Sequence, residues 1–486
     1  MTTQNKNLYV ILAVSKEKQG YGIAKEGKIP WRFPLDMNVF SAMTKMAPFG
    51  TRNSIIMGAI TWNTIAPGLP DRLNIVVSSG RTPLIDGNYI LVSTFEEAII
   101  ISKDCHRIYA IGGIDIVLAA RKHEKYQKEY LTLIKNEYQT DRNIDYVPLN
   151  KPSFTYNYDG TEIVFYNYND YSTDGEDDEF DFRRYKSLPS SEEYQYLAML
   201  HFLMFKPLRE TRNAPTRSSF GTMLKFKLRD KDGNNVLPAL TTKKMNIANI
   251  WAELQMFLRG ETNTSGLLEK GIKIWEGNTN KDFLEKMGLD YPEGFMGPMY
   301  GYQWRFFNKP YHPNEDLPDK FMGVDQLSNL LDDIKKSPHS RRLCITTFNP
   351  EQANDGVLYP CHGLVVQFYV SDIGQLDCMM YQRSADIFLG LPYNIVSYGL
   401  LTHLIVHCLN QRGMNLVPGR LLITLGDWHL YYNHFEPALK QIVREPLTFP
   451  QIEISSEKSN PWDYVWEDFN IKNYSHGPFI KGEMSA

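Results

Sequence analysis

The chain has 486 residues, of which 43% are hydrophobic and 22% charged. This composition is typical of a globular protein and excludes a disordered, fibrous or collagen-like chain. Its 52 basic and 56 acidic side chains give a formal net charge of −4, which excludes an overall basic field for non-specific nucleic-acid binding. Because single domains usually have roughly 100 to 200 residues, the length predicts at least two domains.

The cysteines and the N-terminus indicate a cytoplasmic protein. Five cysteines are an odd number and include no CxxC pair, which argues against a disulfide framework and against a structural zinc or other metal site. The apolar run at residues 8–14 is too short to cross a membrane and lacks a small-residue cleavage site. We therefore predict that this run is a first β-strand and that the protein has no membrane partner.

Residues 1–170 alternate short β-branched runs with segments of helical spacing. The expected strands cover residues 9–14, 54–57, 73–78 and 107–111. The expected helices cover residues 36–46 and 94–102. Residues 154–169 alternate around Asp159-Gly160, which predicts a closing β-hairpin. Together these elements predict an α/β domain.

Residues 171–189 are polar and acidic, and the run Asp-Gly-Glu-Asp-Asp-Glu at 174–179 is typical of a linker. A second domain is predicted for residues 190–486. Its expected helices cover residues 192–205, 247–259, 324–337 and 395–410. Its expected strands cover residues 364–370 and 375–382, so we predict an α+β fold.

Cys361 stands in the sequence Tyr-Pro-Cys-His-Gly, immediately before an expected strand. A side chain at such a strand edge can face a cleft. A lone cysteine there is more often a buried structural residue, because free cysteine packs well as a small apolar group. The motif alone therefore leaves both interpretations open.

Two motifs further along the chain bear on the role of Cys361. Residues 381–395 read Tyr-Gln-Arg-Ser-Ala-Asp-Ile-Phe-Leu-Gly-Leu-Pro-Tyr-Asn-Ile, and residues 426–434 read Gly-Asp-Trp-His-Leu-Tyr-Tyr-Asn-His. In this order the three motifs resemble the thymidylate synthase family over residues 190–486. The resemblance implies methylation of dUMP by 5,10-methylenetetrahydrofolate, with the folate also donating the hydride. It implies a homodimer through the synthase domain as well.

The same resemblance implies a role for each matched residue. Cys361 would add to C6 of uracil, since C5 is a poor nucleophile before that addition; Glu253 would work a proton relay through water and Tyr300 would assist at C5. The implied dUMP contacts are Arg212, Arg341, Arg342, His362, Gln382, Arg383, Ser384, Asp386, Asn394, His429 and Tyr431. The implied folate contacts are Trp275, Asn278, Asp386 and the C-terminal Ala486, in a tail that closes over the site.

Several of these residue types suit the chemistry. A phosphate dianion needs several fixed donors, which forked guanidinium groups provide, and Arg383 would also favour the Cys361 thiolate. By resemblance, Arg341 and Arg342 reach across from the second subunit. Without the motifs these arginines would be a solvated pair, Glu253 an ion-pair partner and His429 a satisfied core histidine.

The synthase pattern has departures. The loop before Phe220 is one residue short, so the arginine that touches phosphate is Arg212 after a deletion or, less favoured, Arg217. Ala385, Trp428 and Phe295 also replace more usual residues. None of these changes removes a group that the chemistry needs.

Shorter motifs in residues 7–170 resemble the dihydrofolate reductase family. They are Ala13-Val14, Gly22-Ile23, Ile29-Pro30-Trp31 with Asp36 five residues later, Met57-Gly58 with Thr61-Trp62, residues 72–78, Ile111-Gly112-Gly113 and Leu131-Thr132. The resemblance implies a mixed sheet with flanking helices that reduces dihydrofolate with NADPH. Asp36 would pair with the pterin and relay a proton. Without this context Asp36 would be a helix-start acid stabilised by the dipole.

The resemblance also implies the contacts of this half. The implied folate contacts are Val14, Trp31, Asp36, Phe40, Arg72 and Thr132. The implied cofactor contacts are Ala13, Gly22, Gly58, Thr61, Ser78, Ser79, Gly112 and Gly113. Ala59, Ser79 and Val117 replace residues that usually help to select the 2′-phosphate of NADPH, and Arg81 or Ser79 could compensate. We therefore still predict NADPH.

The two halves would close a cycle, because a synthase releases the dihydrofolate that a reductase consumes. This pairing resembles the fused reductase-synthase family of protozoa, with dUMP and folates as its partners. Two alternatives stay open. The reductase half could be a decayed folate-binding or dimer-supporting module, or the arginines could bind a nucleic acid, although no basic stripe with interleaved aromatics supports the latter.

Overall fold

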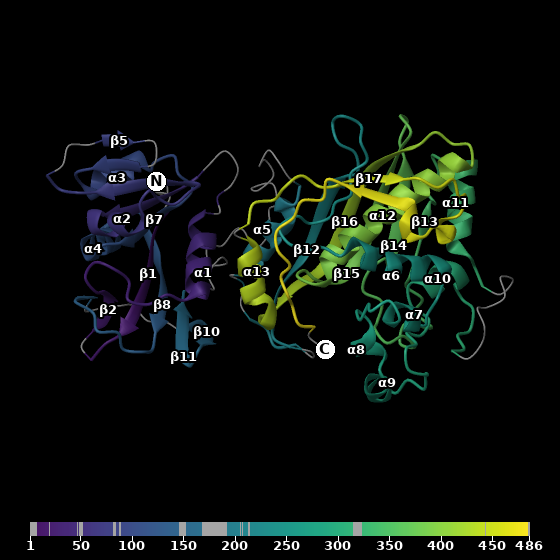
Figure 1. The fold of residues 1–486 in the computed structure, drawn as a ribbon, viewed down its shortest axis with the longest axis horizontal. Coiled ribbons are helices and arrows are strands. Elements are labelled where there is room, and N and C mark those ends of the chain that lie inside the picture. The colour runs from purple at the N-terminus through teal and green to yellow at the C-terminus, as the bar shows by residue number, and fades with distance from the viewer. Residues whose placement is uncertain are drawn as a thin grey trace. The chain divides into compact units, whose positions relative to one another are not determined.

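The structure is a computed structural model. It describes residues 7–18, 20–45, 47, 52–80, 84–86, 89–144, 152–167, 192–204, 206, 208–211, 214–313, 323–442 and 444–484. The chain divides into two compact units (Figure 1). The first comprises residues 1–189 with 197–207 and 438–443, and the second comprises the remaining residues from 190 onward. The acidic linker at 171–189 lies outside the described residues, so its bounds stay a prediction.

The first unit is built on an eleven-stranded mixed sheet, which confirms the predicted fold class. Its strands follow the order β10-β11-β8-β1-β7-β3-β4-β6-β5, and β2 pairs with both β1 and β9. They are β1 (Leu8–Lys16), β2 (Tyr21–Ala24), β3 (Asn53–Gly58), β4 (Arg72–Val77), β5 (Leu84–Asp86), β6 (Tyr89–Val92), β7 (Ile108–Gly112), β8 (Tyr126–Ile134), β9 (Arg142–Ile144), β10 (Pro152–Tyr158) and β11 (Thr161–Tyr166). The central strands β8, β1, β7, β3 and β4 are parallel, so their carboxyl ends share one edge.

Four helices accompany this sheet: α1 (Pro34–Lys45), α2 (Ala59–Ile65), α3 (Phe95–Ile101) and α4 (Ile114–Lys122). Helix α3 begins at Thr94, which forms a capping box with Glu97 and so satisfies backbone donors of the first turn. The hydrophobic core contains every second side chain of β1, together with side chains of the strands and helices next to it. This is expected for a strand in the middle of a sheet. It includes Leu8, Val10, Leu12, Val14, Ile56, Ile75, Ala110 and Leu131.

The second unit holds a five-stranded sheet with the order β12-β16-β15-β14-β13 and a separate β17-β18 pair. Strands β15 and β16 are parallel, and the other neighbours in the larger sheet are antiparallel. The strands are β12 (Thr216–Lys227), β13 (Cys344–Ile345), β14 (Val365–Val370), β15 (Gln375–Asp386), β16 (Val417–Tyr431), β17 (Gln451–Ile454) and β18 (Phe469–Lys472).

The 22-residue helix α12 (Gly390–Gln411) is apolar almost all round and packs on β15, β16 and α6 (Figure 1). It covers the sheet face that carries Val366, Phe368 and Met380, which are all buried. The other helices after residue 190 are α5 (Tyr194–Leu203), α6 (Ile247–Arg259), α7 (Ser265–Leu268), α8 (Glu276–Thr279), α9 (Lys281–Met287), α10 (Gly301–Phe306), α11 (Gln326–Lys336) and α13 (Phe435–Ile442). No helix in the described ranges is long and apolar enough to cross a membrane.

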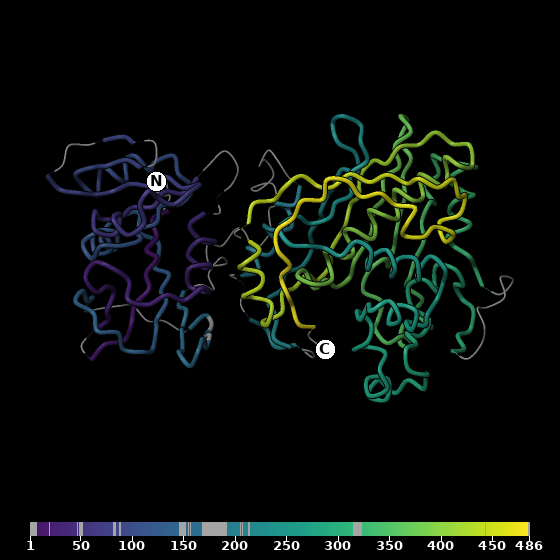
Figure 2. The backbone as a smooth tube through the Cα atoms, in the orientation of Figure 1, coloured from purple at the N-terminus to yellow at the C-terminus, as the bar shows by residue number. Residues whose placement is uncertain are grey.

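The segment after β18 runs back over the second unit beside residues from early in that unit (Figure 2). The Tyr474 hydroxyl donates to the Leu240 carbonyl over 2.7 Å, and the Gly477 N–H donates to the Thr241 carbonyl over 2.7 Å. Arg444 Nη1 donates to the Thr242 carbonyl over 2.6 Å. These bonds direct the C-terminal segment toward the end of the sheet where β15 and β16 finish.

Candidate functional site

The motifs of the second unit meet where β15 and β16 end side by side. The parallel register places Asp386 opposite His429. Cys361 lies in the loop before β14, and its carbonyl accepts a 2.8 Å hydrogen bond from the backbone N–H of Arg383. Three segments far apart in the sequence therefore share one site.

Cys361 is half-buried, and its Sγ lies 3.0 Å from the Tyr300 hydroxyl. Burial raises the pKa of the Cys361 thiol, while the Tyr300 hydrogen bond and the charge of Arg383 lower it. The charge of Arg383 therefore favours the thiolate, but burial outweighs this effect.

Tyr300 is held in a strained position beside Cys361. Its φ is +35°, an uncommon value for a non-glycine residue, and its ring stacks on His362 with centroids 4.2 Å apart. His362 Nδ1 lies 3.1 Å from the hydroxyl of Tyr398, which we did not predict as a site residue. Burial raises the pKa of Tyr300 well above 10, so its phenol keeps its proton and can donate.

Arg383 ties β15 to the loop that carries Cys361. Its Nε donates to the Pro360 carbonyl over 3.2 Å, its Nη2 donates to the Tyr359 carbonyl over 3.4 Å, and the guanidinium lies 5.1 Å from the Tyr359 ring centre. The side chain is exposed, and Ser384 beside it is half-buried. Donors on Nη1 remain to meet an anion.

Gln382 and Asn394 form a buried amide pair. Gln382 Nε2 donates to Asn394 Oδ1 over 3.1 Å and to the Ser384 carbonyl over 3.1 Å. Gln382 Oε1 is buried without a hydrogen-bond partner among the described residues. The Oε1 acceptor of Gln382 and the N–H groups of Asn394 are therefore available to form hydrogen bonds. They suit the edge of a nucleobase that presents both donors and acceptors.

His429 has a fixed orientation. Its Nδ1 lies 2.7 Å from Asp427 Oδ1, and its ring meets the Tyr431 ring edge-on at 5.1 Å. The contact with the carboxylate leaves Nε2 as the ring nitrogen available for another partner. A ring nitrogen beside a phenol suits the sugar hydroxyl that the resemblance implies.

The side chain of Asp386 binds the backbone immediately before helix α12. Its Oδ1 accepts backbone hydrogen bonds from Phe388 over 2.9 Å and Leu389 over 3.2 Å. The same oxygen lies 3.7 Å from His434 Nδ1. The substrate and folate contacts implied for Asp386 stay predictions.

The C-terminal tail docks against this site. The Glu483 carbonyl accepts from His434 Nε2 over 2.7 Å and from Asn433 Nδ2 over 3.0 Å. A Cβ placed on Gly277 would lie 3.7 Å from the Met484 methyl, so the tail also reaches the segment that carries Asn278. The terminal Ala486 lies outside the described residues. The Asn-His pair closes the 426–434 motif, but its tail contact was missed because it depends on long-range docking.

Glu253 and Trp275 form a further part of the site, next to Tyr300. The indole N–H of Trp275 donates to Glu253 Oε1 over 2.8 Å, and the Trp275 and Tyr300 rings lie 6.2 Å apart. Burial raises the pKa of Glu253 to about 7, and the Trp275 hydrogen bond opposes this shift. Glu253 therefore changes protonation near neutral pH, which suits a proton relay.

Trp275→Phe is expected to move the pH profile of the synthase reaction upward. The hydrogen bond stabilises the ionised Glu253, so its loss raises the pKa above about 7 by roughly one unit. Activity that needs the carboxylate then falls below about pH 8 instead of pH 7, measured as kcat against pH. Trp466→Phe, in a different part of the second unit, should leave the profile in place. A profile that stays unshifted in Trp275→Phe contradicts a relay through Glu253.

The structure does not bring Arg341 and Arg342 to Cys361 within one chain. The antiparallel register pairs Cys344 with Gln367, so both arginines lie at the far end of β14 from Cys361. Both side chains are exposed. This placement is compatible with donation to another subunit.

Arg212, the arginine favoured for the phosphate loop, lies outside the described residues. The alternative, Arg217, is fully buried, and its guanidinium lies 4.4 Å from the Phe435 ring centre. Burial lowers the pKa of Arg217 to about 9. Such a buried position disfavours Arg217 as a phosphate ligand.

In the first unit Asp36 on α1 meets Thr132 on β8. Burial raises the pKa of Asp36 to about 6, and the hydrogen bond with Thr132 lowers it. Ala13 and Val14 of β1 pair with Thr132 and its neighbour in the parallel register. These residues line up across two adjacent strands.

The other predicted folate contacts include two aromatic residues and a buried arginine. Phe40 follows Asp36 by one helical turn on α1, and the indole N–H of Trp31 is buried without a partner among the described residues. Arg72 is buried, and it donates from Nη1 to Thr44 Oγ1 over 2.7 Å and from Nε to the Pro70 carbonyl over 2.9 Å. Two of its five N–H donors are thus committed, and the others remain for a carboxylate.

Three neighbouring parallel strands of the same sheet end at or next to a glycine or serine. Gly58 ends β3, Gly112 ends β7 and Ser78 follows β4, on three parallel neighbours. Gly113 has a φ of +83° at the start of α4, and a Cβ on Gly112 would come within 2.8 Å of Thr61 Oγ1. Backbone N–H groups at such a turn can hold a pyrophosphate.

All the cofactor contacts remain predictions, and two of them have a plain alternative or an exposed position. Gly22 lies on β2, where a Cβ would come within 2.3 Å of Thr140 Oγ1, so packing alone explains this glycine. Ser79 is exposed in the turn after β4. Arg81, which could hold the 2′-phosphate, lies outside the described residues.

Comparisons with known proteins match both halves. A thymidylate synthase family model matches residues 194–486, and a dihydrofolate reductase model matches residues 7–159. The bifunctional dihydrofolate reductase-thymidylate synthase 1 of Arabidopsis thaliana is 33% identical over 98% of this chain and 96% of its own. The corresponding bifunctional proteins of Paramecium tetraurelia and Leishmania major are each 34% identical, over 100% and 96% of this chain and 100% and 93% of their own.

Proposed function

The chain belongs to the bifunctional dihydrofolate reductase-thymidylate synthase family, and on that premise we propose how its own side chains carry the two activities. The enzyme methylates dUMP to dTMP and reduces the dihydrofolate that this reaction releases. The observation that supports the synthase assignment best is the Cys361 thiol, 3.0 Å from Tyr300 and beside Arg383. An assay that follows dTMP and NADPH in one purified chain tests the assignment, since a defect in the reductase half must spare dTMP formation and a defect in the synthase half must spare the reduction of added dihydrofolate.

In the synthase half, the Cys361 thiolate adds to C6 of dUMP, and the electron pair of the C5–C6 double bond becomes available at C5 for the one-carbon unit. 5,10-Methylenetetrahydrofolate supplies that carbon and the hydride. Gln382 and Asn394 hold the base edge, while Arg383 meets the phosphate. The buried amide pair and the exposed guanidinium support these roles.

The remaining synthase residues position the reactants. His429 and Tyr431 hold the 3′-hydroxyl, and the Asp427 carboxylate supports this role by fixing the imidazole. Glu253 and its water chain carry protons to and from the base, with Trp275 holding the carboxylate in place. The docked tail excludes water from the site.

In the reductase half, NADPH supplies the hydride, and the residues present fit it. Gly58, Gly112 and Gly113 leave bare backbone where a pyrophosphate would lie. Asp36 lies on α1 and contacts Thr132 of β8. It passes a proton toward N5 of the pterin. The intact contact between Asp36 and Thr132 favours a working reductase over a decayed module.

A second copy of the chain completes the synthase site. One face of the β13-β14-β15 sheet carries large exposed apolar side chains, opposite the face that α12 covers. They are Val365, Tyr369, Met379 and Tyr381, with exposed fractions of 38 to 58%. Such a face is typical of a surface that another subunit buries. With Arg341 and Arg342 at its edge, a two-fold dimer through this face would supply them to the partner's phosphate site.

Mixing two inactive variants tests this dimer. Cys361→Ala and the double variant Arg341→Ala, Arg342→Ala are each expected to lose at least about 10²-fold in thymidylate formation. Refolded together, they should regain about a quarter of wild-type activity, because half the dimers hold one intact site of two. Two copies of the same variant, mixed in the same way, should stay inactive. Failure of the mixture to regain activity contradicts donation across subunits.

We also place the protein in the cytoplasm. All five cysteines are free thiols, which suits a reducing compartment.

A further inference from the structure

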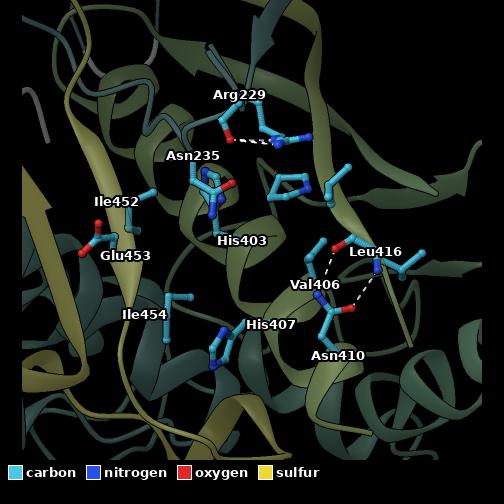
Figure 3. A pocket seen from close by; sticks show the side chains of 13 residues that line it. Arg229, Asn235, His403, Val406, His407, Asn410, Leu416, Ile452, Glu453 and Ile454 are labelled. Atoms are coloured by element: carbon cyan, nitrogen blue, oxygen red, sulfur yellow. Dashed lines mark hydrogen bonds between the residues drawn. The ribbon is translucent and has the colours of Figure 1, made fainter. Parts of the chain in front are cut away.

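Helix α12 carries a second buried residue at the synthase site, to which no role has been assigned above. Tyr398 follows Asn394 by four residues, so the two side chains lie on the same face of the helix. Tyr398 is 2% exposed, and its hydroxyl lies 3.1 Å from Nδ1 of His362, the residue that follows the nucleophile. The C-terminal half of α12 instead lines a cavity of about 380 Å³, with His403 and His407 among its lining residues (Figure 3). Tyr398 therefore belongs to the synthase site, and the cavity does not.

The backbone beside His362 leaves room for the Tyr398 hydroxyl. Gly363 has a φ of +65°, and a Cβ placed on it would lie 2.4 Å from the hydroxyl oxygen, closer than any side chain could pack. Thr347 holds the same loop, because its Oγ1 donates to the His362 carbonyl over 3.0 Å and its N–H donates to the Gly363 carbonyl over 3.1 Å. The contact between Tyr398 and His362 is thus favoured by the local sequence and by the position of the loop.

This contact orients an uncharged imidazole ring. Burial lowers the pKa of His362 to about 3, so the ring is neutral at pH 7 and carries one N–H. Burial raises the pKa of Tyr398 well above its usual value, so the phenol keeps its proton. A phenol can donate to Nδ1 or accept from it, and either arrangement holds the ring in one orientation.

His362 in turn supports Tyr300. Their rings are nearly parallel, with 14° between the planes and centroids 4.2 Å apart, and the Tyr300 hydroxyl lies 3.0 Å from Sγ of Cys361. A residue with a strained backbone, such as Tyr300 at a φ of +35°, keeps its conformation only where its surroundings hold it. The Phe257 ring also contacts Tyr300, but it is tilted by 35° with centroids 5.1 Å apart. The stacked contact therefore comes from His362.

We propose that Tyr398 is a positioning residue of the synthase reaction. Its hydroxyl orients the His362 ring, the ring supports Tyr300, and the Tyr300 hydroxyl is thereby held at hydrogen-bond distance from Sγ. Tyr398 thus acts on the nucleophile through two other side chains. This inference deepens the proposed function and rests on it, because it gives Tyr398 a part in preparing Cys361 for its addition to dUMP.

The first readout is the alkylation of Cys361 by iodoacetamide as a function of pH, with the labelled peptide identified by mass spectrometry. The thiolate is the reacting form, so the pH profile reports the pKa of this thiol. The full chain carries Cys344→Ala throughout, because Cys344 is exposed whereas Cys105, Cys378 and Cys408 are buried. No substrate is added, so the result does not depend on the proposed activity.

Tyr398→Phe keeps the ring and removes the hydroxyl. Burial raises the pKa of Cys361 and the Tyr300 hydrogen bond lowers it. Loss of that bond should move the alkylation profile to higher pH by about half a unit to one unit, and slow alkylation at pH 8 about threefold to tenfold. His362→Gln removes the stacked ring and should move the profile in the same direction. Arg383, whose charge also lowers the pKa, is unchanged in both variants.

A double variant separates positioning from a general effect on the fold. Tyr300→Phe already lacks the hydroxyl, so adding Tyr398→Phe to it should cause no further shift. Two controls should keep the wild-type profile. Tyr464→Phe also removes the hydroxyl of a buried, hydrogen-bonded tyrosine, and His407→Ala removes a hydrogen bond of α12 in its cavity half.

Thymidylate formation gives the second readout. Tyr398→Phe should lower kcat about threefold to tenfold and change KM for dUMP by less than about twofold, because Tyr398 holds catalytic groups and not the substrate. If wild type forms no dTMP, the proposed function fails, whereas alkylation alone decides whether Tyr398 positions the groups around Cys361. The inference is overturned if Tyr398→Phe and His362→Gln keep the wild-type alkylation profile. It is also overturned if Tyr398→Phe shifts that profile equally with and without the Tyr300 hydroxyl.

Discussion

Cys361→Ala is expected to lower thymidylate formation by at least about 10⁴-fold, because no other group can add to C6 of dUMP in its place. Sγ is the reacting atom. The Tyr300 hydroxyl lies 3.0 Å from it, and the charge of Arg383 acts on it. The measurement is dTMP formed from dUMP and 5,10-methylenetetrahydrofolate in single-turnover and steady-state assays. Reduction of added dihydrofolate with NADPH should stay at the wild-type rate.

Cys344→Ala is the matched control for this prediction. Cys344 is an exposed free thiol on β13 of the same unit, opposite Gln367 near the middle of β14. Its replacement should leave thymidylate formation intact. If Cys361→Ala retains the activity, or Cys344→Ala loses it, the nucleophile has been assigned wrongly.

Asp36→Asn is expected to lower dihydrofolate reduction by about 10² to 10⁴-fold, the range of a lost general acid. The pKa of Asp36 is about 6, so the wild-type carboxyl holds its proton below pH 6 and loses it above. Reduction that needs this proton should fall as the pH rises through about 6. The variant should lose this pH dependence and retain thymidylate formation.

Thr132→Val refines the same prediction. The Thr132 hydrogen bond lowers the pKa of Asp36, so its loss raises the pKa and moves the fall in activity to higher pH. Asp86→Asn, on the exposed strand β5, should leave the pH profile unchanged. A wild-type profile that is flat between pH 5 and 8 would argue against Asp36 as the proton source.

Local patterns predicted several of the regular elements. The apolar periodicity of residues 247–259 matches α6, whose Asn246 cap and Gly260 end are also readable in the sequence. The alternation around Asp159-Gly160 matches the β10-β11 hairpin. Helix α12 begins at Gly390, earlier than predicted, because Pro392 fits in the first turn of a helix.

Contacts between distant segments could not be read from local patterns. The long pairing of β12 with β16 joins residues about 200 positions apart, and no turn chemistry records it. Lys243 is a further example, since it is buried and donates to the Phe388 carbonyl over 2.6 Å. Burial lowers the pKa of Lys243 to about 7. A lysine in a polar stretch gives no sign of such burial until the fold surrounds it.

The site itself was predictable only in part. Motifs marked Cys361 and Asn394 as candidate members, but their geometry depends on strand register and helix placement. The role of His434 at the tail and the distance of Arg342 from Cys361 depend on tertiary and quaternary contacts. Single-chain patterns carry no information on these contacts.

The most direct test of the two-activity assignment is one coupled assay on the purified full chain with dUMP, 5,10-methylenetetrahydrofolate and NADPH. NADPH oxidation is expected to follow dTMP formation, Cys361→Ala to abolish both signals, and Asp36→Asn to abolish only NADPH oxidation. Formation of dTMP by wild type without any NADPH oxidation would contradict the presence of a working reductase.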